Sequence, residues 1–200
     1  MVDFDTQLRE LEHRFRNILT IVRAVVSQSL QTAESLDDAK ATIEDRLAAL
    51  SVSFEQLLKR DWEATSLPEL ADAAMAHFTL YMDRIRFDGP AVTIGPKTAM
   101  TLTLAFHELA TNAIKHGALS NDAGTIELTW KVMGSEPEGE LWIQWAERDG
   151  PPVVRPDHQG FGTRLICTAA ARSVQGRAEL DYPSSGVVWT LLAPLKAIGA

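Results

Sequence analysis

The sequence predicts a protein of two parts, a helical hairpin over residues 1–62 and a two-layer α/β sandwich over residues 63–200. Apolar residues recur at helical spacing through the first sixty residues. After Asp61, helical segments are interspersed with strand-like segments in which apolar and polar residues alternate. The chain has 200 residues and 46% of them are hydrophobic, so a packed core is expected.

The hairpin prediction depends on two apolar stripes. The first comprises Leu8, Leu11, Phe15, Ile18, Leu19, Val22, Val25 and Val26, and the second comprises Leu36, Ile43, Leu47, Leu50, Phe54, Leu57 and Leu58. A polar turn separates them, with Ser35 as the candidate N-cap of the second helix and Asp38 in its first turn. One hairpin has too few layers to cover its apolar seam, so we expect a homodimer that forms a four-helix bundle.

The second part alternates helices with strands. Helices are expected at residues 66–80, 97–115 and 162–171, and strands at residues 84–87, 92–94, 125–133, 140–146, 177–182 and 187–192. Ser66 and Pro68 are typical of a helix start, as is Pro96, and Gly117 is expected to be the C′ residue of the second helix. These elements predict a mixed sheet with helices on one face.

Charge and cysteine content exclude several classes of function. Nineteen basic and 27 acidic residues give a net charge of −8, which disfavours nucleic acid or anionic lipid as the main partner. The single cysteine and five scattered histidines exclude a disulfide scaffold and a metal-thiolate site. No signal sequence or membrane segment is visible, so we expect a soluble, cytoplasmic protein.

Three groups of residues carry candidate chemistry, and the first surrounds His13. This histidine projects from the side of its helix opposite the apolar stripe, close to Arg9, Arg16 and Asn17. An exposed imidazole is a competent nucleophile near neutral pH, and guanidinium groups bind phosphate oxygens. The alternative is an ordinary solvated histidine.

The second group lies on the expected helix 97–115. Glu108, Asn112 and Lys115 follow one another at i, i+4 and i+7, so a carboxylate, an amide and an ammonium share one stripe. An amide oxygen can complete the coordination of Mg²⁺, a lysine can bind phosphate, and a carboxylate can act as a base. The alternative is a solvated face with a hydrogen bond between Glu108 and Asn112.

The third group combines an acidic strand end with glycines. Glu147 and Gly150 follow a strand, and Gly160, Gly162 and Thr163 precede a helix. A carboxylate in this position can accept a hydrogen bond from the exocyclic amine of a base, and the glycines let backbone N–H groups approach phosphates. Taken alone, Gly-x-Gly is more often a simple turn.

In this order and spacing, the three groups resemble the bacterial sensor histidine kinases of the HWE / HisKA_2 group, over about residues 5–193. Residues 11–19 resemble the H-box, residues 107–113 resemble the N-box, and Trp145 with Glu147 resembles the W-x-E element. The resemblance implies a dimerisation and histidine phosphotransfer hairpin, followed by a catalytic domain of the gyrase, chaperone and histidine-kinase ATPase type (Bergerat fold). It also implies ATP and Mg²⁺ as cofactors.

The resemblance also implies a role for each matching residue. His13 would accept the phosphoryl group, Asn112 would bind Mg²⁺, and Glu108 would activate the nucleophile or position the metal. Glu147 would bind the adenine amino group in place of the family's aspartate, and Gly150 would shape the adenine pocket. Gly160, Gly162 and Thr163 would lie near the phosphates, Lys115 and His116 would contact them, and His107 would support the N-box.

Two departures from the family pattern stand out. Arg16 occupies a position where lysine is commoner, and only nine residues separate Gly150 from Gly160, which leaves a very short lid over the nucleotide. Twelve residues precede His13, so we expect either a separate sensor protein or a longer kinase of which this chain is the core.

The leading hypothesis is therefore a two-component histidine kinase that phosphorylates His13 with ATP and passes the phosphoryl group to an aspartate of a response-regulator receiver domain. Residues 60–66 would be the hinge between its two parts. The alternative is a phosphotransferase or scaffold that relays phosphate between receiver domains without binding ATP. A gyrase-like ATPase that acts on nucleic acid fits neither the charge nor the first helix.

Overall fold

The computed structural model describes residues 19, 22–23, 25–27, 29–30, 33, 35–59, 64–135, 138–153 and 161–199. The chain divides into two compact units, Met1–Ala48 and Ala49–Ala200. Helix α2 (Leu36–Lys59) continues across this division, and the domain boundary expected at residue 62 stays a prediction.

In the first unit, the described residues between 19 and 30 are helical, and α2 begins at Leu36. The Ser35 hydroxyl accepts a hydrogen bond from the Asp38 amide at 3.1 Å, which confirms the predicted N-cap. The Arg46 guanidinium donates to Ser29 Oγ at 2.6 Å, and Ser29 donates in turn to the Val25 carbonyl at 2.8 Å. This chain of hydrogen bonds joins the two helices of the hairpin.

Only part of the predicted apolar stripe is covered within one chain. Within the stripe, Val25 is 1% exposed and Leu19 is 52% exposed, and Leu30, four residues beyond Val26, is 55% exposed. Leu19 and Leu30 are eleven residues apart and therefore project on nearly the same side of a helix. The expected homodimer is not tested by a single chain and stays a prediction.

The second unit alternates strands and helices, as expected. Its strands are β1 (Thr65–Ser66), β2 (Ile85–Asp88), β3 (Thr93–Ile94), β4 (Thr125–Met133), β5 (Glu140–Arg148), β6 (Arg177–Asp181) and β7 (Val188–Pro194). Its helices are α3 (Leu67–Met75), α4 (Pro96–Lys115), α5 (Phe161–Thr163), α6 (Ala170–Ser173) and α7 (Leu195–Ile198). Three further helical segments are η1 (Thr79–Arg84), η2 (Ala118–Ser120) and the π-helix η3 (Arg164–Ala169).

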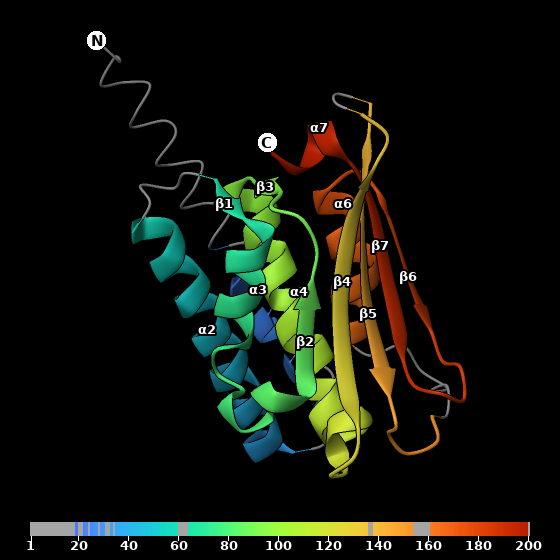
Figure 1. Ribbon diagram of the computed structural model, residues 1–200. Helices are drawn as coiled ribbons and strands as arrows, with labels where there is room; N and C mark the ends of the chain where they lie inside the picture. The colour runs from blue at the N-terminus through green and yellow to red at the C-terminus, as the bar shows by residue number, and fades with distance from the viewer. Residues whose placement is uncertain are drawn as a thin grey trace. The chain divides into compact units, whose positions relative to one another are not determined.

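Five strands form one mixed sheet in the order β2-β4-β5-β7-β6, and β1 pairs with β3 separately. Strand β2 runs parallel to β4, and the other neighbours in the large sheet are antiparallel. Figure 1 shows α3, α4 and α6 on one side of this sheet. Alternate residues of β4 and β5 point toward that layer and are buried, among them Ile126, Leu128, Ile143 and Trp145. The predicted two-layer α/β sandwich is thereby confirmed.

The helix expected at residues 66–80 is shorter than its sequence pattern predicts. It ends at Met75, and the separate 3₁₀ segment η1 follows after a turn at residues 76–77. The buried stripe of α3 also ends at Met75, whereas Leu80 is 91% exposed. An apolar residue at the right spacing therefore did not extend the helix, and Leu80 lies exposed in η1 instead.

The helix expected at residues 162–171 is interrupted. Residues 164–169 form the π-helix η3 between the short helices α5 and α6. The Trp189 indole of β7 donates to the Ile166 carbonyl at 2.8 Å, and the Trp189 ring meets Phe106 of α4 edge-on with centroids 6.3 Å apart. Trp189 therefore fixes the irregular segment between the sheet and α4.

We predict that Ser66→Ala will lower the free energy of unfolding by about 1 kcal/mol. Ser66 Oγ accepts from the Glu69 amide at 3.4 Å, and Glu69 Oε2 accepts from the Ser66 amide at 3.2 Å, so the change removes half of a capping box. Urea denaturation measures the loss. Ser66→Asp keeps an N-cap acceptor and should retain most of the stability, and equal losses in both variants would contradict a capping role.

Candidate functional site

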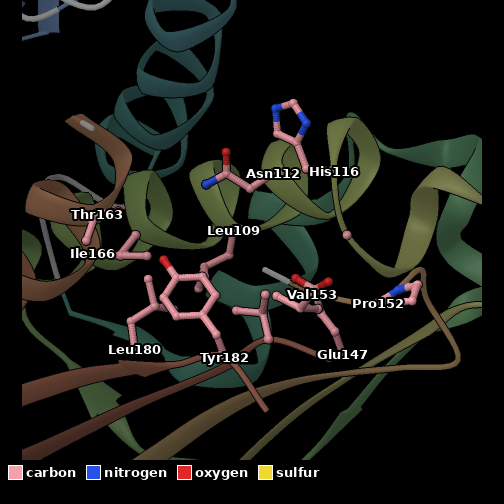
Figure 2. A pocket seen from close by; sticks show the side chains of 12 residues that line it. Leu109, Asn112, His116, Glu147, Pro152, Val153, Thr163, Ile166, Leu180 and Tyr182 are labelled. Carbon is pink, nitrogen blue, oxygen red and sulfur yellow. The ribbon is translucent and has the colours of Figure 1, made fainter. Parts of the chain in front are cut away.

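The candidate site lies entirely in the second unit, between α4 and the sheet. It surrounds a cavity of about 300 Å³, which Figure 2 shows from close by. The cavity is lined by Leu109, Asn112, His116, Gly117, Glu147, Pro152, Val153, Thr163, Ile166, Leu180, Tyr182 and Val187. Most of these side chains are apolar, with a few polar groups that can orient a ligand, as is typical of small-molecule sites.

Helix α4 supplies one wall of the cavity, and its two sides differ in burial. Leu109 is 2% exposed and Ala113 is 0% exposed, so both belong to the core, as the sequence predicts. Asn112 and His116 are exposed on the α4 side of the cavity. Glu108 is 5% exposed, so the predicted solvated stripe begins with a buried carboxylate.

The Glu147 carboxylate is the buried polar group of the cavity. It is 2% exposed at the end of β5, where its backbone pairs with Ile126. Its Oε2 accepts a hydrogen bond from the Ala118 amide at 2.8 Å, and its Oε1 accepts one from the Trp145 indole at 3.3 Å. Burial raises the pKa of Glu147, and the hydrogen bonds from Ala118 and Trp145 oppose that rise.

Glycines leave the space that this carboxylate occupies. A Cβ atom on Gly117 would overlap Glu147 Oε2 and would approach the Ala113 Cα to 2.9 Å. Gly117 is the C′ residue of α4, as predicted, but its φ of −108° is not the left-handed conformation expected of a C′ glycine. The close approach of Glu147, rather than backbone freedom, is therefore the reason for glycine at this position.

Gly150 acts on the same carboxylate through Ala118. A Cβ atom on Gly150 would lie 2.6 Å from the Ala118 Cα, so only glycine lets residue 118 keep its place. Ala118 carries the amide that donates to Glu147. The structure therefore places Gly150 against η2, although it is not among the residues that line the cavity.

A second cluster joins α4 to α5. A Cβ atom on Gly162 would lie 3.0 Å from Glu108 Oε2 and 3.4 Å from Asn112 Nδ2. The two polar side chains therefore converge on the backbone at Gly162. Thr163 follows in α5 and lines the cavity. Carboxylate and amide groups near a helix start suit a phosphate group with its cation.

The predicted site residues thus separate into four groups. Asn112, His116, Glu147 and Thr163 line one cavity. Glu108, Gly150 and Gly162 pack directly behind it or beside it. Lys115 is exposed and outside the cavity lining. His13 and Gly160 lie outside the described residues, so their roles stay predictions.

Sequence reasoning missed most of the apolar walls. Val153, Ile166, Leu180, Tyr182 and Val187 come from four different segments that only the sheet topology brings together. The sequence offers only a weak indication of these walls, the aromatic residue Tyr182 between the alternating strand β6 and the turn that follows it. His107, whose role was expected to be support of the N-box, is 7% exposed, and its ring centroid lies 5.2 Å from that of Phe78.

The described part of the chain lacks both a cluster of metal ligands and a membrane-spanning helix. Within it, no three side chains of His, Cys, Asp or Glu gather as metal ligands. None of its helices has the length and apolar composition needed to cross a membrane.

Known proteins resemble the chain in sequence. Residues 10–91 match the HWE histidine kinase family. The blue-light-activated histidine kinase of Brucella ovis is 35% identical over 188 residues, which make up 94% of this chain and 38% of that protein. The enzyme of the same name from Brucella anthropi is 35% identical over 190 residues, or 94% of this chain and 39% of that protein. The chain thus spans less than half the length of these relatives.

Solved structures support the fold. The histidine kinase domain of the Erythrobacter litoralis EL346 blue-light-activated histidine kinase superimposes with a TM-score of 0.61 at 20% identity, covering 96% of this chain and 92% of that one. A longer structure of the same kinase gives a TM-score of 0.65 at 18% identity, covering 98% of this chain and 61% of that one. The chain carries the transmitter domain of an HWE histidine kinase and is related to the blue-light-activated histidine kinases.

Proposed function

We propose that the chain is an ATP-dependent protein-histidine kinase that phosphorylates His13 and then an aspartate of a response-regulator receiver domain. The observation that carries this proposal is the cavity in which a buried carboxylate, Glu147, lies among apolar walls, with Asn112 and His116 on its α4 side. Membership of the family implies the use of ATP.

The apolar surface and the Glu147 carboxylate of the cavity suit a purine base. Leu109, Ile166 and Tyr182 offer flat or apolar surface, and Glu147 offers acceptor oxygens at the polar end. An exocyclic amino group such as that of adenine is a donor and matches these oxygens. The two N–H donors to Glu147 leave each oxygen one further lone pair for that group.

The polar groups near α5 and on α4 suit the phosphates. Asn112 and Glu108 converge on Gly162, and both Thr163 and His116 line the cavity. We infer that Asn112 contributes an oxygen to Mg²⁺, which neutralises phosphate charge when bound. Glu108 would accept a proton or orient Asn112, and Lys115 and Gly160 would approach the phosphates from the helix end and the loop.

In the proposed reaction, an imidazole nitrogen of His13 forms a bond to the γ-phosphorus of ATP while the bond to the bridging oxygen breaks, which leaves phosphohistidine and ADP. An aspartate oxygen of the receiver domain then takes the phosphoryl group and restores the imidazole. Positioning by the site and neutralisation of charge would supply most of the rate enhancement.

The hairpin is proposed to form a homodimer, as the sequence predicts. Leu19 and Leu30 support this proposal, because both are more than half exposed in one chain and project on nearly the same side. A second copy would cover such a seam in a four-helix bundle.

The central prediction concerns His13. Incubation of the chain with Mg²⁺ and γ-labelled ATP should produce an acid-labile label, and His13→Ala should abolish it. His77→Ala is the matched control, since His77 is an exposed histidine outside the cavity lining, and should keep the label. A label that persists in His13→Ala would refute the phosphorylation site, and a wild-type chain without measurable ATP affinity would favour the phosphate relay.

Asn112→Ala should reduce autophosphorylation at least about a hundredfold, because the bound cation would lose its protein ligand. ATP affinity measured by calorimetry should become nearly independent of Mg²⁺, while adenosine affinity stays near that of the wild type. Thr111→Ala, the neighbouring change on α4 outside the cavity lining, should behave like the wild type. An unchanged dependence on Mg²⁺ in Asn112→Ala would show that Asn112 is not the ligand.

Gly117→Ala should destabilise the protein by at least about 2 kcal/mol and should abolish ATP binding. The φ of Gly117 is negative, so both losses would arise from the contacts of the new Cβ, which would collide with the Glu147 carboxylate and crowd the Ala113 Cα. Thermal unfolding measures the first effect and calorimetry the second. Gly199→Ala, where the added Cβ meets nothing within 4 Å, should change neither; a stable, ATP-binding Gly117→Ala would disprove the packing argument.

A further inference from the structure

Trp145 and Glu147 form a pair on one face of strand β5. Residues at i and i+2 of a strand point to the same side, and here both side chains are buried, at 0% and 2% exposure. The Trp145 indole nitrogen lies 3.3 Å from Glu147 Oε1. Trp145 does not line the cavity, so its contact with the site passes through Glu147.

Both donors to Glu147 are fixed in direction. The Ala118 amide belongs to the backbone, and the indole N–H of Trp145 lies in a rigid ring held in the core. Neither group can act as an acceptor. Each carboxylate oxygen therefore accepts from one donor. A glutamine side chain at residue 147 would place its own NH₂ group opposite one of these two N–H donors.

Close packing removes the remaining freedom of residue 147. A Cβ on Gly117 would overlap Glu147 Oε2, and a Cβ on Gly186 would overlap the Glu147 backbone carbonyl. Gly186 has a φ of +138°, a conformation that side chains rarely allow. The Glu147 backbone amide is also bound, to the Val187 carbonyl at 2.9 Å. The carboxylate is thus presented to the cavity in one orientation.

We propose that Trp145 is a positioning residue, whose indole N–H orients the Glu147 carboxylate so that the cavity prefers a 6-aminopurine nucleotide over a 6-oxopurine nucleotide. This inference rests on the proposed function, because it assumes that the cavity binds a purine nucleotide. An oriented carboxylate accepts from the amino group of ATP, whereas the oxo group of ITP would place an acceptor against an acceptor.

The same contact has a consequence for pH dependence. Burial raises the pKa of Glu147, and the Trp145 hydrogen bond is one of two that lower it. Removal of the indole N–H should raise the pKa further. A protonated Glu147 loses acceptor capacity, so ATP affinity should fall, as pH is lowered, at a higher pH in the variant than in the wild type.

Two other titratable groups line the described cavity, His116 from α4 and Tyr182 after β6. ATP binding is therefore measured over a pH series in two proteins that both carry His116→Gln, one with Trp145 and one with its replacement. A difference between their midpoints then reports on Glu147.

The experiment compares ATP and ITP binding to the full chain by calorimetry in wild type and Trp145→Phe. We expect the preference for ATP over ITP to fall about tenfold, the effect of a lost hydrogen bond to a charged group. The midpoint of the acid loss of ATP binding should move to higher pH. Replacement of Trp145 by 3-benzothienylalanine, which keeps the shape of the indole without its N–H, should give the same two changes if the phenylalanine variant does not fold.

Trp130→Phe is the matched control. Trp130 is 4% exposed on β4, and its indole donates to the Pro90 carbonyl at 2.7 Å, away from the cavity. Its loss should leave both the preference and the pH midpoint unchanged. The inference is overturned if the Trp145 variants keep wild-type preference and midpoint, or if Trp130→Phe shifts them equally. A wild-type chain that binds neither nucleotide would instead overturn the proposed function.

Discussion

The candidate site depends on one buried carboxylate. Glu147 is an ionisable group in the core, and an isolated charge there would be very unfavourable. Its two oxygens are stabilised by two N–H donors, one from the backbone of η2 and one from the side chain of Trp145. The glycines at 117, 150 and 186 provide the space for this arrangement. Several residues that are distant in sequence are therefore explained by one requirement, the accommodation of the Glu147 carboxylate in the core.

The fold positions this carboxylate by joining three segments. Strand β5 fixes Glu147 and Trp145 through its register with β4 and β7, and the end of α4 leads directly into η2 with the Ala118 amide. The Asn121 side chain accepts from the Ala123 and Gly124 amides and donates to the Asp149 carbonyl at 3.0 Å. This contact ties the segment after η2 to the turn after β5, so the two sides of the Glu147 site are held together.

Local patterns predicted many of the described helices and strands. The capping residues Ser35 and Ser66, the helix start at Pro96 and the hairpin of β4 and β5 all depend on interactions between residues near in sequence. Two errors have the same origin. The helix expected up to Leu80 ends at Met75, and the helix near Ile166 contains a π segment, because tertiary packing decided both. The parallel pairing of β2 with β4 likewise has no local sequence signal.

The polar part of the site was predictable and the apolar part was not. Asn112, His116, Glu147 and Thr163 stand in short motifs whose chemistry is visible in sequence, and they do meet at one cavity. Leu180 and Val187 are ordinary strand and turn residues, and only the position of β6 and β7 in the sheet makes them cavity walls.

The turn after β5 shows that a glycine in a turn can be needed for packing rather than for its backbone conformation. The sequence Asp149-Gly150 indicates a glycine turn, yet the left-handed residue is Asp149, with a φ of +56°. Aspartate tolerates this conformation better than most residues, which frees Gly150 for close packing on Ala118. Gly150 therefore acts on Glu147 through the Ala118 backbone, whose amide donates to the carboxylate, and it does so without lining the cavity itself. In this site, the residues that surround the carboxylate matter as much as those that line the cavity.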